Sequence, residues 1–127
     1  MTLPLIVLRP DDAGRVAMLH AAGFPDPWSP AAFRDLLTES TSLGLGIEQH
    51  GGLAGFVLVQ IVVGEADILT IATAPDLKRT GIATQLMHGL LSRLGERGIG
   101  RINSALLKMA AARTIIRPAG TFRWPPF

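Results

Sequence analysis

One stretch of the sequence changes from the pattern of a buried strand to that of an amphipathic helix within a short distance. Residues 67–74 are rich in Ile, Leu and Thr, which favours a strand, and Pro75 ends it because proline has no N–H for a sheet ladder. A basic loop follows, and after Gly81 the pattern becomes helical. Apolar residues recur there at every fourth position: Ile82, Leu86, Leu90 and Leu94. A chain with this order is predicted to form a sheet with helices packed against it.

The start of this helix is a predicted anion-binding site. The first N–H groups of a helix have no partner within it and lie at the positive end of its dipole. Lys78 and Arg79 add positive charge, and Gly81 and Ala83 leave the backbone open to a pyrophosphate. The loop lacks the Gly-Lys-Ser/Thr triplet of a Walker loop and the three glycines of the dinucleotide fingerprint, which excludes those two classes. A phosphate-bearing ligand is therefore expected here, with an ordinary strand-turn-helix as the alternative.

The other patterns predict a single α/β (α+β) domain with a mixed central sheet flanked by helices. Asp11 or Asp12 is expected to cap the first helix, and Ser29 followed by Pro30 to start the second. The glycines of 50–52 permit a tight hairpin. Strands are expected at about 3–8, 43–49, 53–63, 66–73 and 99–104, and helices from Asp11 or Asp12 to about 22, from Ser29, from Gly81 to Gly98 and at 105–116.

Composition excludes several classes of protein. With 127 residues the chain fits one domain, and without cysteine it has no disulfide, thiolate metal site or cysteine nucleophile. The longest apolar run, residues 53–63, is shorter than the roughly 20 residues of a membrane span, and the N-terminus has no basic start. His20, His50 and His88 are isolated in the sequence, so surface positions and no metal site are expected. We expect a cytoplasmic protein that binds no membrane.

The charges divide unevenly along the chain. The net charge is only +2, but up to Leu77 there are three basic and nine acidic residues, and from Lys78 onward nine basic residues and one acid, Glu96. This division suits a protein that holds an anionic ligand with one half and a cationic one with the other. Solvated helix faces are the alternative interpretation.

The basic loop resembles the acetyl-CoA signature of GNAT acetyltransferases, Arg/Gln-x-x-Gly-x-Gly/Ala after a strand and a proline. Here it is residues 78–83, with lysine in the first place as a departure. The resemblance implies that acetyl-CoA binds as co-substrate. Its binding residues would be the strand-end residues Ile71, Ala72 and Thr73 together with Lys78, Arg79, Thr80, Gly81, Ile82, Ala83 and Thr84.

Other segments are similar to RimI-type ribosomal-protein-alanine N-acetyltransferases within the same family. Phe24-Pro25, Trp28-Ser29 and Phe33 resemble the Phe-Pro-Trp-Ser-x-x-x-Phe motif, with two residues inserted. This resemblance covers about residues 9–102 and implies transfer of an acetyl group to a protein N-terminal amine, such as that of a small-subunit ribosomal protein. Phe24 and Trp28 would line the acceptor site, or they are core residues; Glu65 would orient the substrate amine, or it is a solvent-facing turn residue.

The catalytic residues of the RimI-type pattern are missing. That pattern has a Glu in the fifth strand and a Tyr beyond it, whereas this chain has no acid after Glu96 and no tyrosine. The catalytic residues are therefore unknown, with Glu65 as the one candidate. We expect residues 1–102 to form the GNAT core and residues 103–127 a divergent segment with an incomplete set of C-terminal strands, as after a shifted reading frame or truncation. Two alternatives to an active enzyme stay open: a remnant that only binds CoA, and a ribosome- or RNA-binding protein that uses the basic tail, although no direct nucleic-acid contact is expected.

Overall fold

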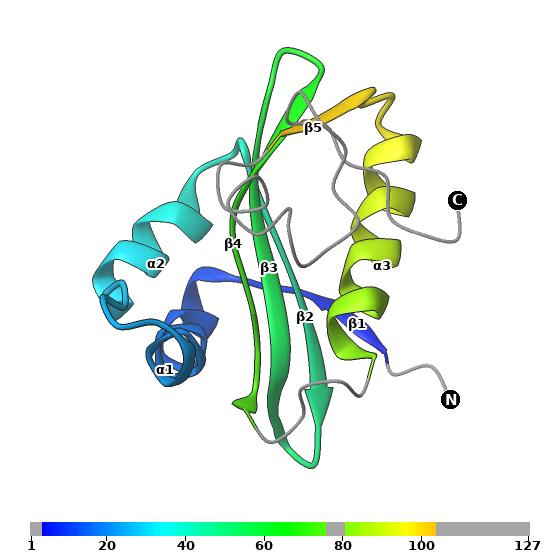
Figure 1. Ribbon diagram of the computed structural model, residues 1–127. Helices are drawn as coiled ribbons and strands as arrows, with labels where there is room; N and C mark the ends of the chain where they lie inside the picture. The colour runs from blue at the N-terminus through cyan, green and yellow to red at the C-terminus, as the bar shows by residue number, and fades with distance from the viewer. Residues whose placement is uncertain (1–3, 76–80, 104–127) are drawn as a thin grey trace.

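In the part of the chain that the structure describes, five strands form one mixed sheet in the order β1-β2-β3-β4-β5. The computed structural model describes residues 4–75 and 81–103, and Figure 1 shows their arrangement. β1 to β4 are antiparallel to their neighbours, and β5 is parallel to β4. The strands are β1 (Leu5–Val7), β2 (Ser42–Gln49), β3 (Gly52–Val62), β4 (Glu65–Thr73) and β5 (Arg101–Asn103). The predicted α/β (α+β) fold with a mixed sheet is confirmed.

Helices cover both faces of the sheet (Figure 1). A short 3-10 helix, η1 (Pro10–Asp12), leads into α1 (Ala13–Gly23), and α2 (Pro30–Thr38) follows on the same face. α3 (Ile82–Glu96) lies on the opposite face. The element order β-α-α-β-β-β-α-β is the one that the sequence predicts. In the described ranges, no helix is both long and apolar enough to cross a lipid bilayer.

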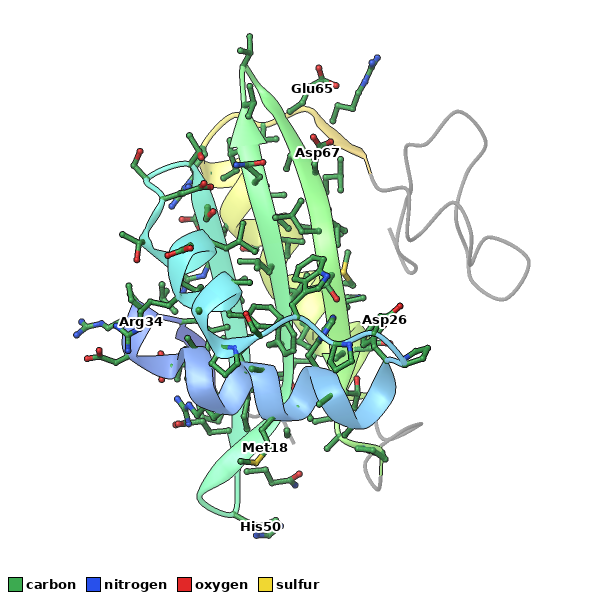
Figure 2. All side chains as sticks on the ribbon, turned by 90° about the vertical axis from the view of Figure 1, so that its left-hand side faces the viewer. Met18, Asp26, Arg34, His50, Glu65 and Asp67 are labelled. Carbon is green, nitrogen blue, oxygen red and sulfur yellow. The ribbon has the colours of Figure 1, made fainter. Side chains whose placement is uncertain are left out.

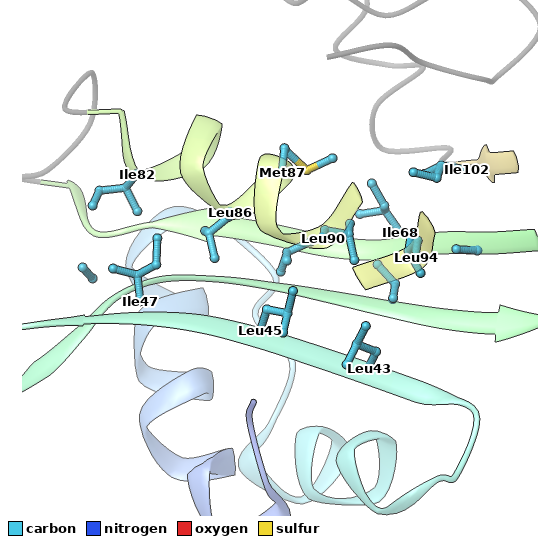
Figure 3. Packing of buried hydrophobic residues seen from close by; sticks show 14 residues of the cluster. Leu43, Leu45, Ile47, Ile68, Ile82, Leu86, Met87, Leu90, Leu94 and Ile102 are labelled. Atoms are coloured by element: carbon cyan, nitrogen blue, oxygen red, sulfur yellow. The ribbon is translucent and has the colours of Figure 1, made fainter. Parts of the chain in front are cut away.

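The α3 face of the sheet holds an aliphatic core. The predicted stripe of α3 is buried in full, and Met87 joins it. Figure 3 shows these side chains against Leu43, Leu45 and Ile47 of β2, with Ile68 of β4 beside them. The periodicity of four therefore predicted the buried face of α3 correctly.

At two of the three helix ends for which the sequence predicted a capping or terminating residue, that residue has the predicted role. Ser29 caps α2, because its Oγ accepts a hydrogen bond from the Ala32 N–H at 3.1 Å. Gly98 follows the last turn of α3 with a φ of +74°, and the Ile99 N–H donates to the Leu94 carbonyl at 2.9 Å, as in a Schellman motif that closes the helix. Asp12 does not cap α1 with its side chain. Its carboxylate instead accepts from the Arg9 N–H at 2.7 Å, which closes the preceding 3-10 turn.

His20 is not on the surface: it is buried, with 2% of its area exposed, on the α1 face of the sheet. The predicted helix at 105–116 and the whole segment 104–127 lie outside the described residues. The last predicted strand is described only as far as Asn103.

Candidate functional site

Among the described residues, β4 has two neighbouring strands along its first part and one along its second. β5 pairs with β4 at Glu65, Ala66 and Asp67 as far as its described residues extend. From Thr70 to Thr73, the described part of the chain offers β4 no partner on that edge, while β3 continues to pair with it as far as Thr73. Within the described residues this stretch is therefore an edge with unpaired backbone groups, and we call residues 70–73 the open half of β4.

A β-bulge separates the two parts of the strand. The register with β3 shifts between Leu58↔Thr70 and Val59↔Ile68, so Leu69 is the extra residue. A bulge bends the strand that carries it and increases its local twist. It also changes the side-chain alternation, so that Ile68 and Ile71, three residues apart, both belong to the α3 face, and Leu69 and Ala72 both belong to the α1 face. The bulge thus lies just beyond the last residue of β4 that pairs with the described part of β5.

The direction of the backbone groups in the open half follows from one hydrogen bond. The Ala74 N–H donates to the Ala54 carbonyl of the β3 side at 2.8 Å. Backbone groups of an antiparallel strand alternate in direction, so Ala72 also faces β3, opposite Phe56. Ile71 and Thr73 therefore direct their N–H and C=O groups toward the open edge. An extended ligand with amide groups can pair with these two residues as an added strand would.

No side chain among the described residues caps the first turn of α3. Its N-cap residue is Gly81, with a φ of +88° that favours glycine. The first helical hydrogen bond runs from the Gln85 N–H to the Gly81 carbonyl at 2.9 Å. The N–H groups of Ile82, Ala83 and Thr84 consequently have no acceptor within the helix. This turn meets the requirement of an anion site as far as the described residues go.

Gly55 of β3 lets this turn lie close to the sheet. A Cβ atom at Gly55 would come within 2.7 Å of the Ile82 Cγ2 and 3.1 Å of the Ala72 carbonyl oxygen. A side chain there would push α3 away from the end of β4. Gly55 therefore brings the open half of β4 and the first turn of α3 together, a contribution that the sequence analysis missed.

The structure brings together seven of the predicted cofactor-binding residues. Three are on the open half of β4, and four are in the first turn of α3 or directly before it. Lys78, Arg79 and Thr80 lie outside the described residues, so their predicted role stays a prediction. The seven are Ile71, Ala72, Thr73, Gly81, Ile82, Ala83 and Thr84.

Phe24 and Trp28 lie on the opposite face of the sheet from α3. They belong to the loop between α1 and α2, which Figure 2 shows at the β4 side through its labelled Asp26. Phe24 is half-buried and Trp28 is 37% exposed, so neither is a fully buried core residue. The Phe24 ring stacks on the His20 imidazole with 4.2 Å between ring centroids, and the Trp28 ring is tilted against it at 5.2 Å. Their exposed surface is available to a substrate on this face.

Glu65 lies at the other end of β4. It is the first residue of the strand and forms an ion pair with Arg101, with 3.8 Å between Oε1 and Nη1. Eight residues separate it from Thr73, which is roughly 26 Å in an extended strand. In Figure 2 its label is at the far end of the sheet from His50, at the hairpin of β3 and β4. The structure therefore does not bring Glu65 to the other candidate residues, and its position favours the interpretation as a turn residue.

A sequence model of the acetyltransferase (GNAT) family matches residues 14–114. The chain belongs to the GNAT acetyltransferase family. The match includes β4, the open half and α3, so the arrangement described above lies within the part that defines the family.

Two comparisons confirm the predicted resemblance to RimI-type members of the GNAT family. The chain is 33% identical over 76 residues to the [ribosomal protein bS18]-alanine N-acetyltransferase of Escherichia coli K12, which is 60% of this chain and 51% of that protein. The chain thus spans about half the length of this curated relative. The crystal structure of the E. coli ribosomal-protein-S18-alanine N-acetyltransferase superposes with a TM-score of 0.77 at 26% identity, over 86% of this chain and 72% of that one.

A more distant solved structure shares the fold. Arabidopsis thaliana NAA60, crystallised in complex with acetyl-CoA, superposes with a TM-score of 0.71 at 18% identity, over 87% of this chain and 79% of that one. The GNAT fold of this chain is therefore seen in an acetyl-CoA complex of another protein.

Proposed function

We propose that this protein is an acetyl-CoA-dependent N-acetyltransferase that acts on the N-terminal amine of a protein, in the cytoplasm. The observation that carries the proposal is the open half of β4 next to the first turn of α3, which no described side chain caps, in a chain of the GNAT family. Residues 1–102 would form the core of the enzyme, and residues 103–127 a divergent segment.

The two parts of the site would bind two parts of acetyl-CoA. The backbone of Ile71 and Thr73 would pair with the amides of the pantetheine arm, as in strand addition. A main-chain N–H of this edge, directed at the thioester carbonyl, would stabilise the negative charge that develops on its oxygen. The free N–H groups of Ile82, Ala83 and Thr84, with Lys78 and Arg79 before them, would bind the pyrophosphate.

The acceptor would lie on the α1 side of the sheet, against Phe24 and Trp28. An N-terminal amine, with a pKa of about 8, is partly neutral at pH 7, whereas a lysine amine with a pKa of about 10.4 is not. An N-terminal acceptor therefore needs less help from a base, which suits a chain with no catalytic Glu or Tyr at the positions of the RimI-type pattern. Because the E. coli relative acts on alanine of ribosomal protein bS18, we propose a small-subunit ribosomal protein as substrate class.

Two measurements on the full chain test this function. Acetyl-CoA should raise the melting temperature by an amount that grows with its concentration, since a ligand that binds the native state stabilises it. With an Ala-starting peptide as acceptor, the protein should then release free CoA from acetyl-CoA. With the same peptide carrying a blocked N-terminus, it should not. Stabilisation without CoA release would mean that the protein binds CoA without catalysis, and absence of both would contradict the proposal.

A further inference from the structure

His20 is a buried imidazole enclosed by four aromatic side chains. The Phe24 ring stacks on it with 4.2 Å between centroids and 15° between planes. Trp28 is tilted against it at 5.2 Å, Phe33 meets it edge-on at 5.2 Å, and Phe56 lies at 6.4 Å. Only 2% of the His20 surface is exposed. Phe33 and Phe56 are fully buried, whereas Phe24 and Trp28 are partly exposed, so His20 links the fixed core to the surface loop.

The His20 imidazole also forms a hydrogen bond with the backbone of the loop of residues 24–28. Nδ1 of His20 accepts a hydrogen bond from the Trp28 N–H at 3.1 Å. This bond fixes the tautomer, because Nδ1 can accept only when the ring proton is on Nε2. The Phe24 N–H donates to the His20 carbonyl at 3.1 Å, so both ends of residues 24–28 are tied to one residue. The Phe24 end thus continues from α1 through a backbone hydrogen bond, and the His20 side chain holds the Trp28 end.

We propose that His20 is a positioning residue for acetyl transfer: it holds residues 24–28 so that Phe24 and Trp28 form one side of the acceptor site. The inference rests on the proposed function. His20 acts through the loop, because its own ring is covered, and does not contact the reacting atoms. Phe56 pairs in register with Ala72 of the open half of β4, which places the aromatic cluster beside the part of β4 where the acetyl group would be.

The neutral form of His20 is the one that can hold the loop. Protonation would add a hydrogen to Nδ1. This Nδ1–H would point at the Trp28 N–H, and the hydrogen bond would be lost. Burial lowers the pKa of His20 below its ordinary value of 6.5. The hydrogen bond is therefore kept at neutral pH and lost as the pH falls below 6.5 toward the lowered pKa.

The charged groups on the described elements around His20 are exposed or paired with one another, so burial is the cause of its lowered pKa. The loop carries Asp26, which is exposed, and α2 carries the exposed Arg34 and Asp35. On α1, Arg15 is paired with Glu48 and Asp12. β3 contains no charged residue. Desolvation is the cause that lowers the pKa of His20.

Two substitutions separate the hydrogen bond from the ring. His20→Phe keeps an aromatic ring but removes the acceptor, and His20→Asn keeps an acceptor near the position of Nδ1 but removes the ring. Neither variant titrates near pH 6.5. His50→Asn is the matched control, because His50 is exposed at a hairpin turn with a φ of +55°, which asparagine tolerates.

The first readout is Trp28 fluorescence in a Trp124→Phe background, which leaves Trp28 as the single tryptophan of the sequence. We expect a fluorescence transition below pH 6.5 in the protein with His20 and in His50→Asn, and no transition in either His20 variant. A transition that survives in both His20 variants would overturn the inference. This readout needs no enzymatic activity.

The second readout is acetyl transfer to an Ala-starting peptide at pH 7.5. We expect His20→Phe to raise the acceptor KM about tenfold, because one hydrogen bond to the loop is lost, with the acetyl-CoA KM within about twofold of the original. The ratio of acceptor KM between His20→Phe and the unmodified protein should approach one as the pH falls below 6.5. An unchanged acceptor KM, or an equal rise in both KM values, would overturn the positioning role.

Absence of transfer by the unmodified protein would overturn the proposed function and with it the acceptor role of Phe24 and Trp28. The fluorescence readout would still decide whether His20 holds the loop.

Discussion

The first and second parts of β4 use their backbone groups differently. Residues 65–67 lie between two strands, with β3 on one side and β5 on the other, and their backbone belongs to the sheet. Residues 70–73 pair with β3, and the described part of the chain leaves their other edge open. The bulge at Leu69 lies between the two. One strand thus serves as structure at one end and as a candidate binding surface at the other, and substitutions in each part should have separable effects.

Ile68→Ala should have the largest effect, and it should be an effect on stability. Ile68 is 3% exposed in the aliphatic core, on the paired side of the bulge. Removing its side chain leaves a cavity that should lower the free energy of unfolding by about 3 kcal/mol. Chemical denaturation measures the loss. If acetyl-CoA affinity of the folded variant fell as well, the two parts of β4 would not be separable.

Gly81→Asp should have the next largest effect, on ligand binding. Its carboxylate would face the phosphates at the positive end of α3, and we expect acetyl-CoA affinity to fall roughly 100-fold in calorimetry. Gly81→Asn is the matched control, because it has nearly the same shape and tolerance of positive φ without the charge. Equal affinity of the Asp and Asn variants would show that no phosphate binds at this turn.

Thr73→Pro should weaken acetyl-CoA binding with little effect on the sheet. It removes an N–H that faces the open edge, and proline is tolerated there. One lost hydrogen bond corresponds to about a tenfold rise in Kd. Ala72→Pro is the matched control: it removes an N–H that faces β3 and should cost about 2 kcal/mol of stability. Similar stability losses in both variants would contradict the assigned directions of the two residues.

Val63→Asn should have the smallest effect. Val63 and Gly64 form the turn between β3 and β4, with φ values of +48° and +76°. A β-branched residue is strained at positive φ, and Asn-Gly is preferred in such a turn. We expect a gain of about 1 kcal/mol in thermal or chemical unfolding, with acetyl-CoA affinity unchanged. A stability loss would show that Val63 makes a contact that outweighs its strain.

The sequence predicted the elements of the fold but not the geometry that opens β4. Local signals were sufficient to predict where the strands and helices lie. These signals are the apolar periods of two and four, the cap residue Ser29 and the terminating residue Gly98. The bulge was missed because helices cover both faces of β4, so consecutive apolar residues such as Ile68 and Leu69 are expected there with or without a bulge. Which backbone groups face the open edge depends on the pairing with β3, and pairing is not encoded in one strand alone.

The burial of His20 was also missed, for a different reason. Ala13, Val16, Ala17 and His20 have the i, i+3, i+4, i+7 spacing of a buried helix face, so the signal was present. Histidine was interpreted by residue type instead of by position. What the sequence could not supply is the set of aromatic partners, because Phe33 and Phe56 come from α2 and β3.

Hydrogen exchange at individual backbone amides of β4 tests the central claim most directly. In the free protein, the N–H groups of Ile71 and Thr73 should exchange faster than those of Thr70 and Ala72, which face β3. Saturating acetyl-CoA should slow exchange at Ile71 and Thr73 by about tenfold or more, because their N–H groups then have a partner. Protection of Ile71 and Thr73 before acetyl-CoA is added, or no change after it, would contradict the assignment of this edge as the binding surface.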